Sequence, residues 1–144
     1  MKLVFALHAV ATLAMFGAIW IVQLVHYPLF SGVGEAGWTA YEGQHQTRIT
    51  WIVGPLMVVE LVTAVWLVFE RPPFVPTWMA LLGVLLVGVI WLSTAFVQVP
   101  LHNTLSQGFD ATAHQRLVAT NWIRTVAWSL RAGLVSWFVY RLVP

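Results

Sequence analysis

Residues 75–99 read VPTWMALLGVLLVGVIWLSTAFVQV, and this stretch contains no formally charged side chain. A helix needs about 20 consecutive apolar residues to cross the hydrocarbon core of a bilayer. The stretch is long enough for one crossing, and other apolar runs precede and follow it. The sequence therefore predicts a single all-α domain, an integral membrane four-helix bundle with transmembrane helices at residues 3–26, 39–69, 75–99 and 111–142.

The composition supports a membrane protein and excludes several other classes. Of the 144 residues, 60% are apolar and 8% are charged, and the mean hydropathy is +0.81. A soluble domain carries about 25% charged residues, so a soluble enzyme and a disordered chain are excluded. A net charge of +2 is too small for a nucleic-acid binder. The chain has no cysteine, which removes disulfides and thiol chemistry.

The basic residues near the ends of the predicted spans indicate the orientation in the membrane. Lys2, Arg71 and Arg141 fall on one side, and Arg48 and Arg116 fall on the other. Cytoplasmic loops carry the excess of Lys and Arg. This three-to-two majority predicts that both termini are cytoplasmic. In a bacterium, the chain would lie in the inner membrane with its two longer loops facing the periplasm. Whether the chain forms a homodimer is left open.

Two of the predicted helices are longer than the membrane is thick. Thr39 and Glu42 have the spacing of a capping box, which predicts that the second helix starts at Thr39. Asp110 is a candidate N-cap for the fourth helix. At 1.5 Å per residue, each helix is about 46 Å long, against about 30 Å for the hydrocarbon core. We therefore expect both helices to extend beyond the outer face.

Polar and aromatic side chains recur at helical spacing on three of the predicted helices. Lipid would penalise such stripes if they faced outward, so we expect them to line a polar cavity that opens to the outer side. Gln23 and His26 end the first helix at the outer surface, at the level where Gln98 and His102 end the third helix. The stripes comprise Tyr41, His45, Arg48 and Ile52 on the second helix, Trp91, Thr94, Gln98 and His102 on the third, and Asn121, Arg124, Trp128 and Arg131 on the fourth.

Four of the five histidines fall on the predicted outer side. Imidazole is the commonest metal-binding side chain, so His26, His45 and His102 are candidate ligands from three helices, with His114 in reserve. The scarcity of carboxylates favours copper, iron or zinc over calcium or magnesium. A haem b held between His26 and His102 is an alternative. The other interpretation is that these histidines are simply polar residues tolerated outside the membrane.

Glu60 and Arg131 each lie deep within a predicted span, and a lone charge at that depth is costly. We therefore expect the two side chains to form an ion pair near the middle of the membrane. The pair would fix the register of the second and fourth helices. Alternatively, Glu60 carries protons or binds a metal.

Three tryptophans, Trp20, Trp91 and Trp128, fall away from the membrane surfaces where tryptophan usually lies. Two interpretations remain open for them. They line a pocket for an aromatic or lipidic substrate, together with Gln23, Gln98 and Asn121, or they fill the core of the bundle.

Two short motifs lie in the last third of the chain, TAFVQVPLHNTL at residues 94–105 and NWIRT at residues 121–125. Together they resemble the four-helix membrane family that includes the anthrone oxygenases. His102 stands where that family usually has asparagine, with Asn103 following it. The resemblance implies a four-helix membrane fold and oxidation of an aromatic or quinone-like substrate.

These observations give two hypotheses for the function. The first is a metal-dependent oxidoreductase or oxygenase with a histidine-lined site at the outer mouth, acting on a lipid-soluble or aromatic substrate. Arg48 and Arg124 would stabilise developing negative charge, and Tyr41 would donate a proton or a hydrogen bond. The second is a non-enzymatic protein that binds or transports a metal ion or a small molecule, in which Glu60 and Arg131 belong to the transport path.

Overall fold

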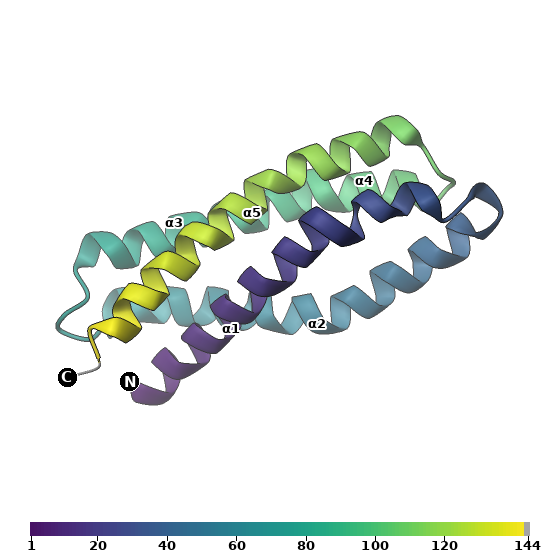
Figure 1. The fold of residues 1–144 in the computed structure, drawn as a ribbon. Helices are drawn as coiled ribbons and strands as arrows, with labels where there is room; N and C mark the ends of the chain where they lie inside the picture. Colours follow the sequence, from purple (N-terminus) through teal and green to yellow (C-terminus); the bar gives the residue numbers. More distant parts are fainter. Residues whose placement is uncertain (143–144) are drawn as a thin grey trace.

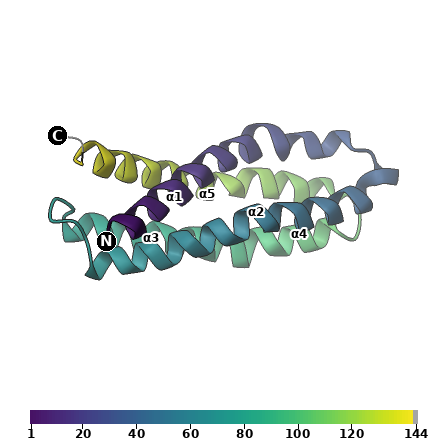
Figure 2. The same ribbon diagram turned by 90° about the horizontal axis from the view of Figure 1, so that it is seen from below.

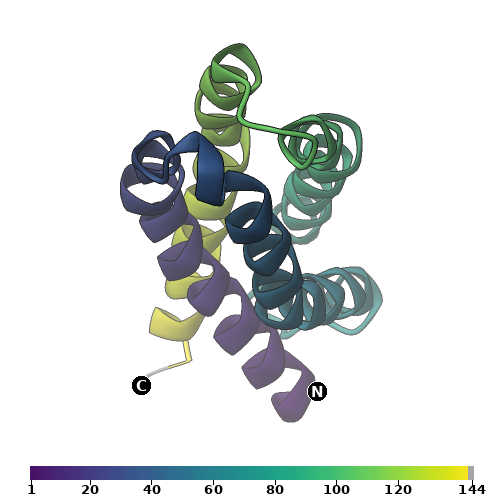
Figure 3. The same ribbon diagram turned by 90° about the vertical axis from the view of Figure 1, so that its right-hand side faces the viewer.

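The computed structural model describes residues 1–142 as four long helical segments packed side by side (Figure 1). This arrangement confirms the prediction of an all-α, four-helix protein. Seen along the bundle, the four segments surround a common axis (Figure 3). The five α-helices are α1 (Lys2–Ile21), α2 (Glu35–Phe69), α3 (Thr77–Ser93), α4 (Val99–Leu105) and α5 (Ala111–Tyr140).

Two of the long segments contain a turn of π-helix. One turn, Val22–His26, extends α1 and is followed by a 3₁₀ turn, Pro28–Gly32. The other, Thr94–Gln98, joins α3 to α4 without a break. A π turn inserts an extra residue and rotates the side chains that follow, and such turns are frequent at functional sites. Both turns carry residues that the sequence analysis singled out, among them His26 and Gln98.

The two ends of the bundle differ in what they contain. The N-terminus, the end of α5 and the turn between α2 and α3 lie at one end, which we call the terminal end (Figures 1 and 2). The connections from α1 to α2 and from α4 to α5 lie at the other, which we call the histidine end because His26, His45, His102 and His114 gather towards it. The N-terminus and the end of α5 therefore share one side of the molecule.

Within residues 1–142, three helical segments are long and apolar enough to cross a membrane: Lys2–Gly32, Glu35–Phe69 and Thr77–Leu105. This finding agrees with the first three predicted spans. The fourth, which corresponds to α5, is not among them, because its inward face carries polar side chains. Arg124 and Arg131 on that face are buried, whereas Val126 and Leu130 on the outward face are more than half exposed.

Two helix boundaries differ from the predicted ones by four residues or more. α2 starts at Glu35 instead of Thr39, after Gly34, whose φ of 81° allows the chain to reverse at that point. The predicted capping box is therefore wrong, and Glu42 lies inside the helix and is buried. The third predicted span continues through Pro100 to Leu105 instead of ending at residue 99, because Pro100 lies in the first turn of α4, where a missing N–H is tolerated.

The other helix-start prediction is confirmed. The Asp110 carboxylate accepts a hydrogen bond from the backbone N–H of Ala113 at 2.7 Å and so caps α5. A larger apolar cluster packs around Trp38, Phe30 and Trp128, and a smaller one around Phe5 and Phe138 closes the terminal end.

Candidate functional site

Three of the four candidate histidines converge at the histidine end, as the sequence predicts. Nε2 of His26 and Nδ1 of His45 are 2.9 Å apart, so that one ring donates to the other. The rings of His45 and His102 have centroids 5.4 Å apart. These side chains come from the π turn after α1, from α2 and from α4, so the cluster joins three segments that are distant in the sequence.

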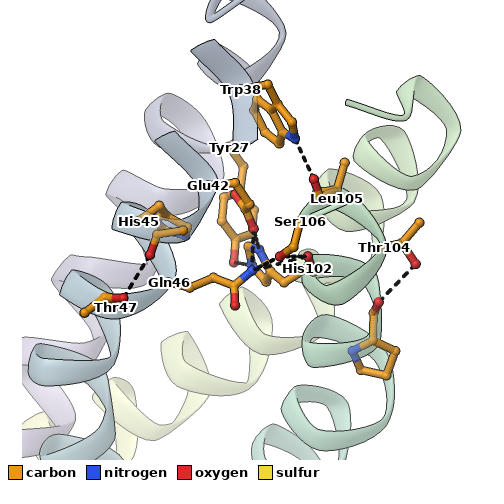
Figure 4. Close-up of polar contacts among 12 residues, drawn as sticks. Tyr27, Trp38, Glu42, His45, Gln46, Thr47, His102, Thr104, Leu105 and Ser106 are labelled. Atoms are coloured by element: carbon orange, nitrogen blue, oxygen red, sulfur yellow. Dashed lines mark hydrogen bonds and ion pairs between the residues drawn. The ribbon is translucent and has the colours of Figure 1, made fainter. Parts of the chain in front are cut away.

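His102 lies between a carboxylate and a phenol (Figure 4). Nδ1 of His102 is 2.6 Å from Oε1 of Glu42, and Nε2 is 2.9 Å from the Tyr27 hydroxyl. An ionised carboxylate only accepts hydrogen bonds, so Nδ1 carries a proton, and in the tautomer with a single ring proton Nε2 accepts from Tyr27. Glu42, His102 and Tyr27 therefore form a chain of hydrogen bonds in which the carboxylate orients the imidazole.

Gln46 fixes this chain in place from α2. Its Nε2 donates to Oε1 of Glu42 at 3.0 Å and to Oγ of Ser106 at 2.6 Å. The Ser106 hydroxyl donates to the backbone carbonyl of His102 at 2.9 Å. Figure 4 shows Gln46 reaching from α2 to the end of α4. Gln46 and His102 thus hold the same oxygen of Glu42, Oε1, whereas Oε2 is buried and has no hydrogen-bond partner among the described residues.

Arg124 lies on the other side of the Tyr27 hydroxyl. Its Nη2 donates to that oxygen at 3.2 Å, and it also donates to Oδ1 of Asn121 at 2.6 Å. Asn121 is oriented by Oε1 of Gln23, which accepts from its Nδ2 at 2.8 Å. Within residues 1–142, no carboxylate pairs with Arg124, although the side chain is only 6% exposed. A buried cation without an anionic partner is costly, so the site is suited to an anionic or strongly polarised oxygen.

A cavity of about 290 Å³ adjoins these polar groups. Its apolar wall includes Met15, Ile19 and Met57, together with Trp91 and Trp128. Tyr27, His45, His102 and Arg124 form a polar part of the lining, and Gln98 also lines the cavity. The space thus combines a long apolar surface with a group of hydrogen-bonding side chains.

The predicted pocket residues divide into two groups. Trp91, Gln98 and Trp128 line the cavity. Gln23 and Asn121 do not, and they lie behind Arg124 and orient it. Trp20 does not line the cavity either, and its indole N–H donates to the Ser129 hydroxyl at 3.1 Å.

Two residues predicted to be catalytic lie outside the cavity. Arg48 is exposed beside a shallow surface depression. Tyr41 packs against Phe30 and Trp38, with ring centroids 5.7 Å and 6.1 Å apart. Ile52, from the same predicted stripe, is 58% exposed. The predicted inward stripe of the second helix is therefore right for His45, which is buried and lines the cavity, and wrong for Arg48 and Ile52.

The face that α2 buries includes Trp38, Glu42, His45, Met57 and Glu60. Eighteen residues separate Glu42 from Glu60, which is about five turns of 3.6 residues. Once Glu60 is placed inward, this spacing places Glu42 inward as well, and it is the signal that the sequence analysis missed. Tyr27 offers no comparable signal, because its direction depends on the π turn before it.

His114 does not join the other histidines. Its Nε2 donates to the backbone carbonyl of Tyr27 at 2.8 Å, and its ring stacks on Phe30. Its role is to anchor the segment that carries Tyr27, and its prediction as a reserve metal ligand gains no support from this geometry.

The described residues do not bring the predicted metal ligands together in a preformed metal site. In the part of the chain that the structure describes, no group of three His, Asp or Glu side chains is placed to hold an ion. The physical reason is that His26 and His45 point ring nitrogens at each other, and both nitrogens of His102 are bonded to Glu42 and Tyr27. Binding of copper, iron, zinc or haem therefore stays a prediction from the sequence alone.

The predicted Glu60–Arg131 pair is present and buried. Nε of Arg131 is 3.2 Å from Oε1 of Glu60, and the side chains are 1% and 2% exposed. Trp128, from the cavity wall, donates its indole N–H to Oε2 of Glu60 at 2.8 Å. Nearer the terminal end, His8 is buried, and its Nδ1 lies 2.8 Å from the Thr63 hydroxyl.

No protein-family model, curated protein or solved structure matches the chain. The resemblance to the anthrone oxygenase family therefore stays a prediction. Fold and site together define a class: an all-helical protein with three segments apolar enough to cross a membrane and a cavity with a hydrogen-bonded polar lining.

Proposed function

We propose that this chain is an integral membrane protein that binds a lipid-soluble molecule in its cavity and removes a proton from the oxygen-bearing end of that molecule. In this proposal the termini lie in the cytoplasm, and the histidine end faces the periplasm of a bacterial inner membrane. The observation that carries the proposal is the cavity, whose wall is largely apolar and whose polar part holds Tyr27, His102 and Arg124.

The size and lining of the cavity fit a small amphipathic molecule. Its volume of about 290 Å³ is near the lower end of the range of roughly 300–1,000 Å³ typical of small-molecule pockets. Methionine and tryptophan side chains favour an aromatic or alkyl body. The polar groups favour an end that carries a hydroxyl oxygen, such as a phenol or hydroquinone, and they also suit the carbonyl oxygen of the corresponding quinone, which binds without giving up a proton.

The hydrogen bonds around Tyr27 support transfer of a proton from such a hydroxyl. As the ligand hydroxyl gives its proton to the Tyr27 oxygen, Tyr27 gives its own proton to Nε2 of His102. The products are an imidazolium ion beside the Glu42 carboxylate and a ligand oxyanion beside the Arg124 guanidinium. Each charge that forms therefore faces an opposite charge that is already in place.

We further propose that the bound hydroquinone is oxidised by dioxygen: it loses two electrons and two protons to give the quinone, and dioxygen takes them up to give hydrogen peroxide. Deprotonation favours this step because the anion is the more easily oxidised form. The proposal assigns no step to a metal ion, since the imidazole nitrogens that would hold one are bonded to each other and to Tyr27. The alternative, a protein that binds the molecule without converting it, uses the same cavity. Absence of product from bound hydroquinone under aerobic conditions would favour that alternative.

Filling the cavity tests the proposal. Ala18 lines the cavity, whereas Ala14, one turn earlier on α1, is exposed. In lipid nanodiscs, a benzoquinone with a decyl tail is expected to bind the wild-type chain and quench the fluorescence of Trp91 and Trp128. Ala18→Phe is expected to weaken binding at least about tenfold, because a phenyl ring occupies the space of the ligand. Ala14→Phe is expected to bind like the wild type, and equal affinities for the three proteins would reject the proposal.

A further inference from the structure

We propose that the cavity is loaded from the bilayer, through an opening between α2 and α4. This inference rests on the proposed function, and it specifies the substrate class as molecules that dissolve in the membrane. Three observations support it: which residues of the cavity lining are exposed, which side chains close the two ends of the cavity, and which residues surround the opening.

The exposed lining residues lie on two facing edges. Most of the residues that line the cavity are buried or half-buried. The exposed ones are Thr50 on α2 and Val99 and Asn103 on α4. The side chains that line the cavity from α1 and α5 are buried or half-buried. The cavity therefore reaches the surface between α2 and α4.

The histidine end of the bundle is closed above the cavity. Phe30 and Trp38 are 0% and 1% exposed. The indole N–H of Trp38 donates to the backbone carbonyl of Leu105 at 2.6 Å, which ties the start of α2 to the end of α4 (Figure 4). A ligand arriving from water along the bundle axis would have to displace these side chains.

The cavity is also closed towards the terminal end. Met57 and Trp128 form its floor and are 4% and 0% exposed. Behind them lies the buried Glu60–Arg131 pair, which Trp128 joins through its hydrogen bond to Glu60. Because both ends of the cavity are blocked, the opening between α2 and α4 is the entry route that the described residues leave to a ligand.

The edges of this opening carry both polar and apolar groups, with Thr50 and Asn103 beside Val99. On α2, Gln46, Thr50 and Gly54 follow one another at intervals of one turn, and Gly54 contributes no side chain to obstruct the gap. Near the α4 edge, Phe96 is 75% exposed and lies one turn before Val99. Gln46 bridges to Ser106 and so closes the opening on the side of the histidine end. A molecule with an apolar body and a polar end would therefore find matching groups at the opening.

Reversible cross-linking across the opening tests this route. The natural chain has no cysteine, so Thr50→Cys and Asn103→Cys introduce the sole thiols. A bifunctional methanethiosulfonate would join the two helices, and a reductant would release them. The control pair, Trp20→Cys and Trp122→Cys, joins α1 to α5, where the two rings are 5.7 Å apart and do not line the cavity.

The readout is the rate at which the decyl-tailed benzoquinone quenches tryptophan fluorescence in nanodiscs. Cross-linking before addition of the quinone is expected to slow binding at least tenfold, and reduction is expected to restore it. Cross-linking after loading is expected to slow release by a similar factor. Unchanged rates after cross-linking across the opening would overturn the lateral route and leave the proposed function standing. No binding before cross-linking would overturn both.

Discussion

Replacement of Arg131 by methionine is expected to lower the free energy of unfolding by about 3–5 kcal/mol. The guanidinium is 1% exposed and pairs with a Glu60 carboxylate that is 2% exposed. Removal of one member leaves the other as an uncompensated charge in a medium that solvates it poorly. Trp128 would still donate to Glu60, but one indole N–H does not balance a full negative charge.

The double variant separates a charge effect from a packing effect. Replacing both members, with Glu60→Leu and Arg131→Met, removes the uncompensated charge and is expected to recover most of the lost stability. Arg116→Met, on the exposed side of the same helix, is expected to change stability by less than about 0.5 kcal/mol. The free energy of unfolding in mixed detergent is measured for the wild type and the three variants. A double variant no more stable than Arg131→Met would show that the pair does not behave as described.

The second large effect is expected at Arg124. Arg124→Met should weaken binding of the decyl-tailed benzoquinone by about 2 kcal/mol or more, which is roughly thirtyfold or more in affinity. The guanidinium lines the cavity, and within the described residues no carboxylate neutralises it. An oxygen of the ligand is the partner that we expect it to bind.

Two controls accompany this measurement. Decylbenzene has the same tail and ring but no oxygen, so its binding, followed as a shift in unfolding temperature, should be the same in Arg124→Met and in the wild type. Arg48→Met should leave both ligands unaffected, because Arg48 is exposed outside the cavity. If Arg124→Met weakened decylbenzene as much as the quinone, the role of Arg124 would be to hold the fold and not to bind the oxygen.

Much of the fold could be predicted because hydrophobic length and isolated charges are strong signals. The charge-free run at 75–99 predicts a long helix, and the structure has helix through nearly all of it. Glu60 and Arg131 were placed together on the argument that a deep charge needs a partner, and they form the predicted pair. The stripe on the last helix, Asn121 to Arg131, is buried as expected.

The candidate site was harder to predict, because its geometry depends on features that have no clear pattern in the sequence. The π turn at Val22–His26 directs Tyr27 to His102, and neither the turn nor its rotation follows from periodicity. Glu42 was assigned to a helix cap because Thr39 precedes it at capping spacing. The helix starts earlier, at the glycine turn, and the carboxylate therefore faces His102. These two residues complete the site that the histidines only indicated.

The measurement that tests the central claim most directly is the absorption spectrum of a bound nitrophenol with an alkyl tail. It is recorded in nanodiscs at a pH where the free molecule is fully protonated. The account predicts that the wild-type chain binds the probe as the coloured phenolate, because the proton passes through Tyr27 to His102 and Arg124 faces the oxyanion. Tyr27→Phe, which keeps the ring and removes the hydroxyl, should bind the probe in its protonated form. A protonated spectrum on the wild-type chain, or a phenolate spectrum that survives in Tyr27→Phe, would contradict the account.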